Sequence, residues 1–318
     1  MPDRVGARFL PDGASASGLF NTVTGHFWES LAAIETALSE PRPQAGLARR
    51  PSVRAFASYF DLLEAVIADD PDGAREALRR VHAALAQPPR AFLRNWADLD
   101  PDEASLFDRQ INVDPTTRVS LSAPSPEAFH RAEQALMAAL ELLDAAAPEI
   151  AAEIRALIGE IVLVVGGVND NSRFDGATAF ANWGALFLNA DEHADRIEAI
   201  DGLAHESAHA LLFGHTLGHP LVENPPDERH ASPLRSDLRP LDGIFHATFV
   251  TARMHYAHSR VMASGLLDAE EVGRARASLE RCRSAFADGH ATLLRHARMT
   301  PMGATLMADA AAYMDGAA

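Results

Sequence analysis

The chain contains no lysine, and this absence removes several kinds of chemistry. All 28 lysine-or-arginine positions are arginine, so the chain can form neither a lysine Schiff base nor the lysine contact of a phosphate-binding P-loop. A carboxylate or phosphate of a ligand is then best held by arginine, whose planar guanidinium binds such groups through two parallel hydrogen bonds.

Cysteine and long apolar runs are also scarce. Cys282 is the only cysteine, which excludes an intrachain disulfide, a four-cysteine zinc module and an iron–sulfur cluster held by this chain alone. No segment reaches about 18 consecutive apolar residues, and the first residues lack the basic start and apolar core of a signal peptide. We therefore expect a cytoplasmic protein in which the thiol is structural.

Positive charge is in short supply. The 28 basic residues face 44 acidic ones, which gives a net charge of −16 and a pI near 5.2. This balance argues against an extended surface for nucleic acid or for an anionic membrane, whereas a neutral or basic peptide would be electrostatically acceptable. With 47% hydrophobic residues, the chain has ample material for a buried core.

The hydrophobic pattern of the N-terminal half is helical. Apolar residues recur there at spacings of three and four, which is typical of amphipathic helices. Proline-rich stretches separate these segments, and Asp72 is placed to cap one of them. The predicted helices are 27–38, 53–67, 74–86 and 126–143.

The pattern changes at residue 160. Two apolar runs bounded by glycine, asparagine or aspartate, 160–166 and 184–189, predict strands. The later segments predict helices from about 194 to 213, from about 241, and over 260–318 with a break at 302–303.

These elements predict an α+β fold that is predominantly helical. We expect a mainly helical N-terminal region over 1–150, packed on an α+β region over 151–318 that carries the catalytic site. The order strand, strand, helix also indicates a zincin-like arrangement, in which short strands accompany the helix that holds the metal.

The strongest chemical signal is His-Glu-Ser-Ala-His at 205–209. Four residues are just over one helical turn, so His205 and His209 project from one face and can bind one divalent metal. The surrounding apolar residues predict a buried helix, where a polar group without a partner costs on the order of a few kcal/mol. We therefore expect a metal at the two histidines, with Glu206 as the candidate catalytic residue.

Four downstream residues are candidates for the third ligand, and of these His219 directly precedes Pro220, which favours a loop. His215 has the metzincin spacing, but Leu212 stands where that pattern requires a glycine to turn the chain. Glu223 stands among prolines that preclude a helix. His246 falls at the start of a second long apolar helix, and it completes a three-point site if the two helices cross.

Arginines near these positions are candidates for holding a carboxylate of a bound co-substrate. Arg253 is seven residues after His246, two turns along the same face. Arg235 and Arg239 lie in the segment between the two helices and are rival candidates. A metal with an arginine above it suits a keto-acid co-substrate.

The run HESAH together with LVENPPDERHASPLRSDLRPLDGIFHATFVTARM resembles the HExxH motif-containing peptide modification family, which comprises 2-oxoglutarate-dependent iron peptide β-hydroxylases. The similarity covers roughly 200–260, with weaker support from GALFLNA upstream. It implies that His205, His209 and a downstream histidine, here His246, bind Fe(II), and that 2-oxoglutarate chelates the iron with its far carboxylate on an arginine. It also implies that a ribosomally made precursor peptide is hydroxylated at a β-carbon, with Glu206 orienting a ligand or water.

Two other functions are compatible with the motif. In a zinc-dependent peptidase, Glu206 would be the general base and His215 or Glu223 the third ligand. A metal-stabilised peptide-binding module would bind peptide without reaction. The expected partner is a precursor peptide, with no nucleic acid and no membrane, and the sequence leaves a homodimer open.

Overall fold

The structure is a computed structural model that describes residues 8–42, 50–113, 118–168, 174–217, 219–234 and 237–317. Its chain forms two compact units, each assembled from separate segments. The helical unit comprises Met1–Leu19, Gln134–Ala156 and Asp195–Ala318, and the sheet unit comprises Phe20–Glu133 and Leu157–Ala194.

These units differ from the expected regions 1–150 and 151–318. The reason is that early segments belong with the C-terminal helices: Arg253 donates a hydrogen bond to the Phe9 carbonyl and forms an ion pair with Glu153. Contacts between residues so far apart in the chain leave no signal in local periodicity.

The fold is α+β and predominantly helical, as predicted. Each helix expected in the N-terminal half is present, and the range of α2 was predicted to the residue. Asp70, not Asp72, caps α3, because its side chain accepts from the Gly73 amide while Pro71 occupies the first turn. The helices are α1 (Gly13–Leu38), α2 (Val53–Ile67), α3 (Pro71–Leu85), α4 (Pro101–Ile111) and α5 (Pro126–Ala146).

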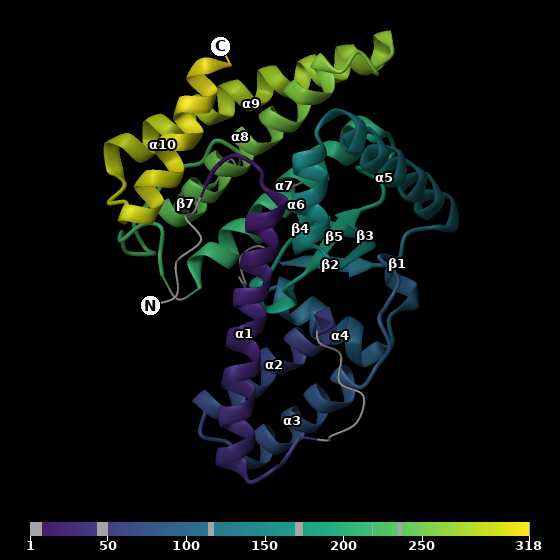
Figure 1. Ribbon diagram of the computed structural model, residues 1–318, viewed down its shortest axis with the longest axis vertical. Coiled ribbons are helices and arrows are strands. Elements are labelled where there is room, and N and C mark those ends of the chain that lie inside the picture. Colours follow the sequence, from purple (N-terminus) through teal and green to yellow (C-terminus); the bar gives the residue numbers. More distant parts are fainter. Residues whose placement is uncertain are drawn as a thin grey trace. The chain divides into compact units, whose positions relative to one another are not determined.

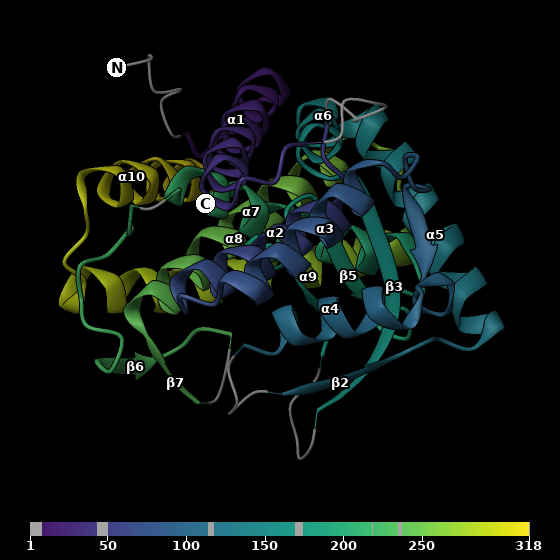
Figure 2. The same cartoon turned by 90° about the horizontal axis from the view of Figure 1, so that it is seen from below.

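The sheet unit contains a small mixed sheet (Figures 1 and 2). Its strands follow the order β1-β3-β5-β4, in which β1, β3 and β5 are parallel, and β2 pairs antiparallel with the end of β3. The two predicted strands are confirmed as β3 and β5. The strands are β1 (Leu93–Asn95), β2 (Val119–Ser122), β3 (Glu160–Val168), β4 (Gly176–Ala177) and β5 (Ala185–Asn189).

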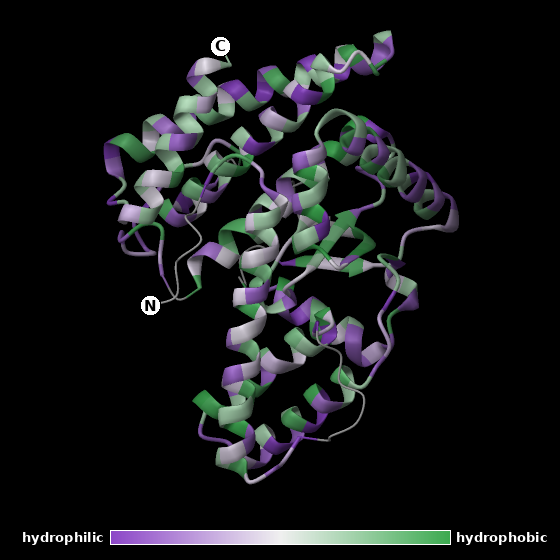
Figure 3. Ribbon diagram, in the orientation of Figure 1, coloured by the Kyte–Doolittle hydropathy of each residue, from purple (hydrophilic) through white to green (hydrophobic). Residues whose placement is uncertain are grey.

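The centre of this sheet is almost wholly apolar. All side chains of β5 are buried, and β3 and β5 are hydrophobic along most of their length (Figure 3). Continuous apolar runs of this kind are typical of parallel strands buried on both faces. The ring of Phe187 packs edge-on against Phe107 of α4, with 5.5 Å between the ring centroids, so α4 covers part of the sheet.

The helical unit contains the C-terminal helices and a short hairpin. Helices α8 and α9 lie side by side (Figure 1), and α7 packs against α8. A capping box of Asp268 and Glu271 begins α9. The elements are α6 (Pro148–Leu157), α7 (Arg196–Thr216), β6 (Arg229–Ala231), β7 (Leu238–Pro240), α8 (Leu241–Ala263), α9 (Ala269–His296) and α10 (Pro301–Gly316).

The expected break at Met302-Gly303 was wrong. Both residues lie in the first turn of α10, where Thr300 caps the helix by accepting from the Gly303 amide. A Cβ on Gly303 would come within 2.2 Å of the Leu221 carbonyl oxygen. The glycine is therefore explained by a close backbone approach.

The zincin-like arrangement remains a prediction, because the strands belong to the sheet unit and the HExxH helix to the helical unit. Within the described residues, no helix has both the length and the apolar character required to cross a membrane.

Candidate metal centre

Helix α7 carries the HExxH motif in its middle, as the sequence predicts. Asp195 caps the helix by accepting from the amides of Ile197 and Glu198 at 2.8 and 3.1 Å. Because no glycine stands at position 212, the helix continues through the motif to Thr216. Most of its circumference is buried, so the motif sits in an apolar environment.

The structure brings together the three predicted histidine ligands. His205 Nε2 and His209 Nε2 lie 3.1 Å apart, and His209 Nδ1 lies 3.1 Å from His246 Nδ1. The two helices therefore place His246 beside the motif across an interval of 37 residues. We call these three side chains the histidine cluster.

Burial favours the neutral form of His209 and His246. The pKa of His209 lies well below its ordinary value of 6.5, mainly because of burial and also because His205 and His246 would repel its charge. Burial likewise lowers the pKa of His246, an effect that the negative charge of Asp242 partly opposes. Neutral imidazole is the form that binds metal ions, so the donor chemistry fits a divalent ion at neutral pH.

The geometry of the cluster fits one ion in part. Two ligands with bonds of about 2.1 Å lie roughly 3.0–3.4 Å apart at one ion, which agrees with the Nε2 pair of His205 and His209. Among the described residues, however, no group of three His, Cys, Asp or Glu side chains is already arranged to hold a metal. His209 faces its two neighbours with different ring nitrogens, so the ring of His209 or of His246 must turn before all three bind a common ion.

Glu206 lies on the same side of His205 as the Nε2 atom. Its Oε1 is 4.0 Å from His205 Nε2, and its side chain is only 6% exposed. A carboxylate at this position can accept a proton or a hydrogen bond from a water or ligand at the cluster. This placement agrees with the catalytic role proposed for Glu206 without choosing between orientation and general-base catalysis.

Met254 is a neighbour of the cluster that the sequence reasoning missed. Its Sδ lies 3.4 Å from His205 Nδ1, the ring nitrogen that faces away from His209. Methionine is normally a core residue, so no sequence signal distinguishes it. Only the packing of α7 on α8 reveals the contact.

Arg253 is fully occupied by contacts within the helical unit. Only 2% exposed, it forms an ion pair with Glu153 and donates from Nη1 to the Phe9 carbonyl. Burial raises the pKa of Glu153, an effect that the positive Arg253 opposes. The structure therefore gives Arg253 a role in packing and does not support the expected carboxylate clamp.

Arg239 has a more suitable position for a clamp. It lies in β7, and its side chain packs over Gly243, one turn before His246 on α8. The side chain is 24% exposed and forms an ion pair with the exposed Asp237 at 3.3 Å. Arg235 lies outside the described residues.

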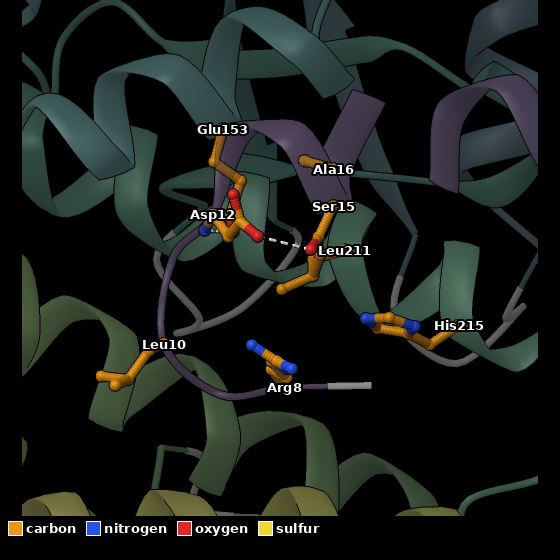
Figure 4. A pocket seen from close by; sticks show the side chains of 8 residues that line it. All are labelled: Arg8, Leu10, Asp12, Ser15, Ala16, Glu153, Leu211 and His215. Carbon is orange, nitrogen blue, oxygen red and sulfur yellow. Dashed lines mark hydrogen bonds between the residues drawn. The ribbon is translucent and has the colours of Figure 1, made fainter. Parts of the chain in front are cut away.

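The alternative candidates for the third ligand, His215 and Glu223, are not part of the histidine cluster. His215 lines a separate small pocket with Arg8, Asp12, Ser15 and Glu153 (Figure 4). The free volume of this pocket is about 10 Å³, about the space of one water molecule. Burial lowers the pKa of His215 to about 4.

Glu223 is exposed in the segment after α7, where its amide donates to the Arg298 carbonyl at 2.7 Å. Among the described residues, no contact joins His215 or Glu223 to the histidine cluster.

No family model matches the chain, and no curated protein matches it significantly. The functional assignment therefore depends on the chemistry of the cluster and on the local resemblance of its sequence.

Proposed function

We propose that the protein is an Fe(II)- and 2-oxoglutarate-dependent dioxygenase that hydroxylates the β-carbon of a residue in a ribosomally synthesised precursor peptide. The observation that carries the proposal is the contact of three histidine side chains, His205, His209 and His246, at the interface of α7 and α8. The resemblance of the surrounding sequence supplies the reaction class.

The three imidazoles would hold the ion and leave coordination positions open. His205 and His209 would bind through Nε2, and His246 would complete the set after its ring turns. Three protein ligands leave room for the two oxygens of a 2-oxo acid and for O₂. The bound iron would supply oxygen activation, coupled to conversion of 2-oxoglutarate and O₂ into succinate, CO₂ and the hydroxylated peptide.

Arg239 would bind the far carboxylate of 2-oxoglutarate. Its guanidinium is partly exposed and forms an ion pair with the exposed Asp237, and a dicarboxylate can displace such a pair at low cost. Arg253 would have to abandon the buried Glu153 to do the same, which is costly because a buried charge would lose its partner.

The charge of the chain supports a peptide substrate. A net charge of −16 attracts basic segments and steers their approach. We place the reaction in the cytoplasm, where ribosomal peptides are made and where the single buried thiol of Cys282 would stay reduced.

The second candidate is a zinc-dependent peptidase. One observation favours it: the Glu206 carboxylate lies 4.0 Å from the ring nitrogen of His205 that would face the ion. A general base on metal-bound water needs this proximity.

A stepwise anaerobic titration separates the two candidates. Fe(II) is added to the whole protein, followed by 2-oxoglutarate, and the visible spectrum is recorded. A dioxygenase gives a metal-to-ligand charge-transfer band, which zinc cannot give, and forms succinate after O₂ is admitted. Absence of both in folded protein, together with metal-dependent peptide cleavage, would overturn the proposal.

The Glu206→Gln variant adds an independent measurement. A peptidase should lose nearly all turnover because water is no longer activated, whereas a dioxygenase should retain measurable succinate formation. A binding module would show peptide binding with neither reaction. The Glu280→Gln variant is the matched control, because it makes the same substitution at an exposed glutamate of α9.

A further inference from the structure

The second ring nitrogen of His205 has an unusual neighbour for a metal ligand. A metal-bound histidine normally donates its other ring N–H to a carboxylate, a backbone carbonyl or a water, which fixes the tautomer and increases the basicity of the ligand. In this protein, His205 Nδ1 faces the thioether of Met254 at 3.4 Å. A thioether sulfur is only a weak acceptor.

A carboxylate lies nearby but is directed elsewhere. Asp201 is one helical turn before His205 on α7. His258 Nε2 lies 2.6 Å from Asp201 Oδ1, and Ser278 Oγ donates to Oδ2 at 2.8 Å. Both carboxylate oxygens are thus engaged with α8 and α9, which leaves Met254 against His205.

We infer that Met254 is a positioning residue, which holds His205 as the Nδ1–H tautomer and directs its Nε2 lone pair to the metal. This inference depends on the metal role of His205 in the proposed function, and a peptidase would need the same positioning. Because sulfur accepts only a weak hydrogen bond, His205 stays less basic than it would beside a carboxylate. The protein therefore holds its ion more loosely than a carboxylate-supported site would.

Two variants at position 254 separate hydrogen bonding from packing. Met254→Leu keeps the apolar volume but removes the acceptor, whereas Met254→Gln supplies an amide oxygen, a stronger acceptor. Met137→Leu is the matched control, because Met137 is 46% exposed on α5. Zn(II) affinity of the whole protein is measured by competition titration, and the His205 tautomer is read from ring ¹⁵N shifts of metal-free protein.

Met254→Leu should weaken Zn(II) binding about tenfold, at the low end of the effect of such outer partners, and should mix the His205 tautomers. Met254→Gln should bind Zn(II) at least as tightly as the parent, and Met137→Leu should equal the parent. Parent affinity and an unchanged tautomer in Met254→Leu would overturn the inference, as would a Met254→Gln protein no tighter than Met254→Leu.

These results are independent of the oxygenase assignment. If the parent binds Zn(II) but forms no succinate from 2-oxoglutarate, the proposed function fails while the role of Met254 stands. If the parent shows His205 without a proton on Nδ1, the role of Met254 fails whether or not succinate forms.

Discussion

The central strands of the sheet and the helix pair α7–α8 are both deeply buried, but they bury different kinds of side chain. Every side chain of β5 is buried, and Asn189 is the only polar one. Helix α8, in contrast, buries His246, His255 and His258. Within the described residues, His255 Nε2 and His258 Nδ1 have no hydrogen-bond partner.

This difference indicates where stability and chemistry reside. Burying apolar surface stabilises a fold, whereas burying ring nitrogens without full pairing opposes it. The sheet therefore serves as a stable core. Helix α8 instead buries ring nitrogens at a cost in stability, and one of its buried histidines, His246, belongs to the histidine cluster that would hold the proposed ion.

The largest effect should come from removing the middle histidine of the cluster. His209→Ala should weaken metal binding more than about 100-fold, beyond the usual effect of an outer partner, and abolish succinate formation, because His209 contacts both other ligands. Metal titration and succinate assays measure this loss. If the His209→Ala protein kept the parental metal affinity, the α7–α8 interface would not be the metal-binding region, and its contrast with the sheet would fail.

Removal of a buried charge from the sheet should lower the free energy of unfolding without changing metal affinity. Arg94 is 5% exposed and donates to Glu103 and Glu160, which joins β1 to α4 and β3. Arg94→Met leaves two buried carboxylates without their partner, which should lower the free energy of unfolding by about 3–5 kcal/mol.

Urea unfolding measures this cost, and Arg75→Met, which removes an exposed ion pair, is the control with little expected effect. The metal affinity of the folded fraction should stay at the parental value. A change in that affinity would show that the sheet also shapes the cluster.

Acid should destabilise the helical unit through His255. Burial, assisted by the positive charges of Arg283 and His258, lowers the pKa of His255 to about 4 from 6.5. The unfolded chain takes up this proton below about pH 6.5 and the folded chain only near pH 4, so the free energy of unfolding falls between these values and is retained above them.

About two pH units separate 6.5 from a measurement at about pH 4.5, and at about 1.4 kcal/mol per unit the expected loss is about 2–3 kcal/mol. Urea unfolding at about pH 4.5 and 7.5 measures it across this window. His255→Phe should reduce the acid-induced loss without removing it, because burial also lowers the pKa of His215 to about 4. An equal loss in parent and variant would contradict the assignment to His255.

The smallest effect concerns the arginine near the cluster. Arg239→Ala should raise the KM for 2-oxoglutarate about tenfold with little change in kcat, because a partly exposed charge-assisted hydrogen bond contributes about 1.5 kcal/mol. Steady-state succinate assays measure both constants. Arg239→Lys should restore part of the affinity, and an unchanged KM in both variants would show that another cation binds the co-substrate.

Much of the fold follows from local pattern. The range 53–67, predicted from apolar residues that recur with helical period, matches α2 to the residue, and the structure shows that Ser52 caps its start. Strands β1, β2 and β4 were missed, since runs of two to four residues carry too little periodicity. The two units were also missed, because each joins segments that are distant in the chain.

Local sequence likewise predicts part of the candidate site, and the rest depends on packing. His205, Glu206 and His209 are recognisable because one helical turn sets their spacing. The choice among His215, Glu223 and His246 depended on where α7 ends and what packs against it. Local sequence could not distinguish Arg253 from Arg239 as a carboxylate-binding residue. The structure distinguishes them, because Arg253 is paired inside the helical unit and Arg239 is partly exposed.

The sequence by itself determined the helical character of the chain, its two central strands and a pair of histidines on one helical face, because these depend on residues only a few positions apart. Only the tertiary structure decided that His246 joins the pair, that Arg253 is occupied by Glu153 and that Met254 lies against His205. Such contacts arise from the packing of whole helices, and the free energy of that packing is spread over many residues that no short motif records.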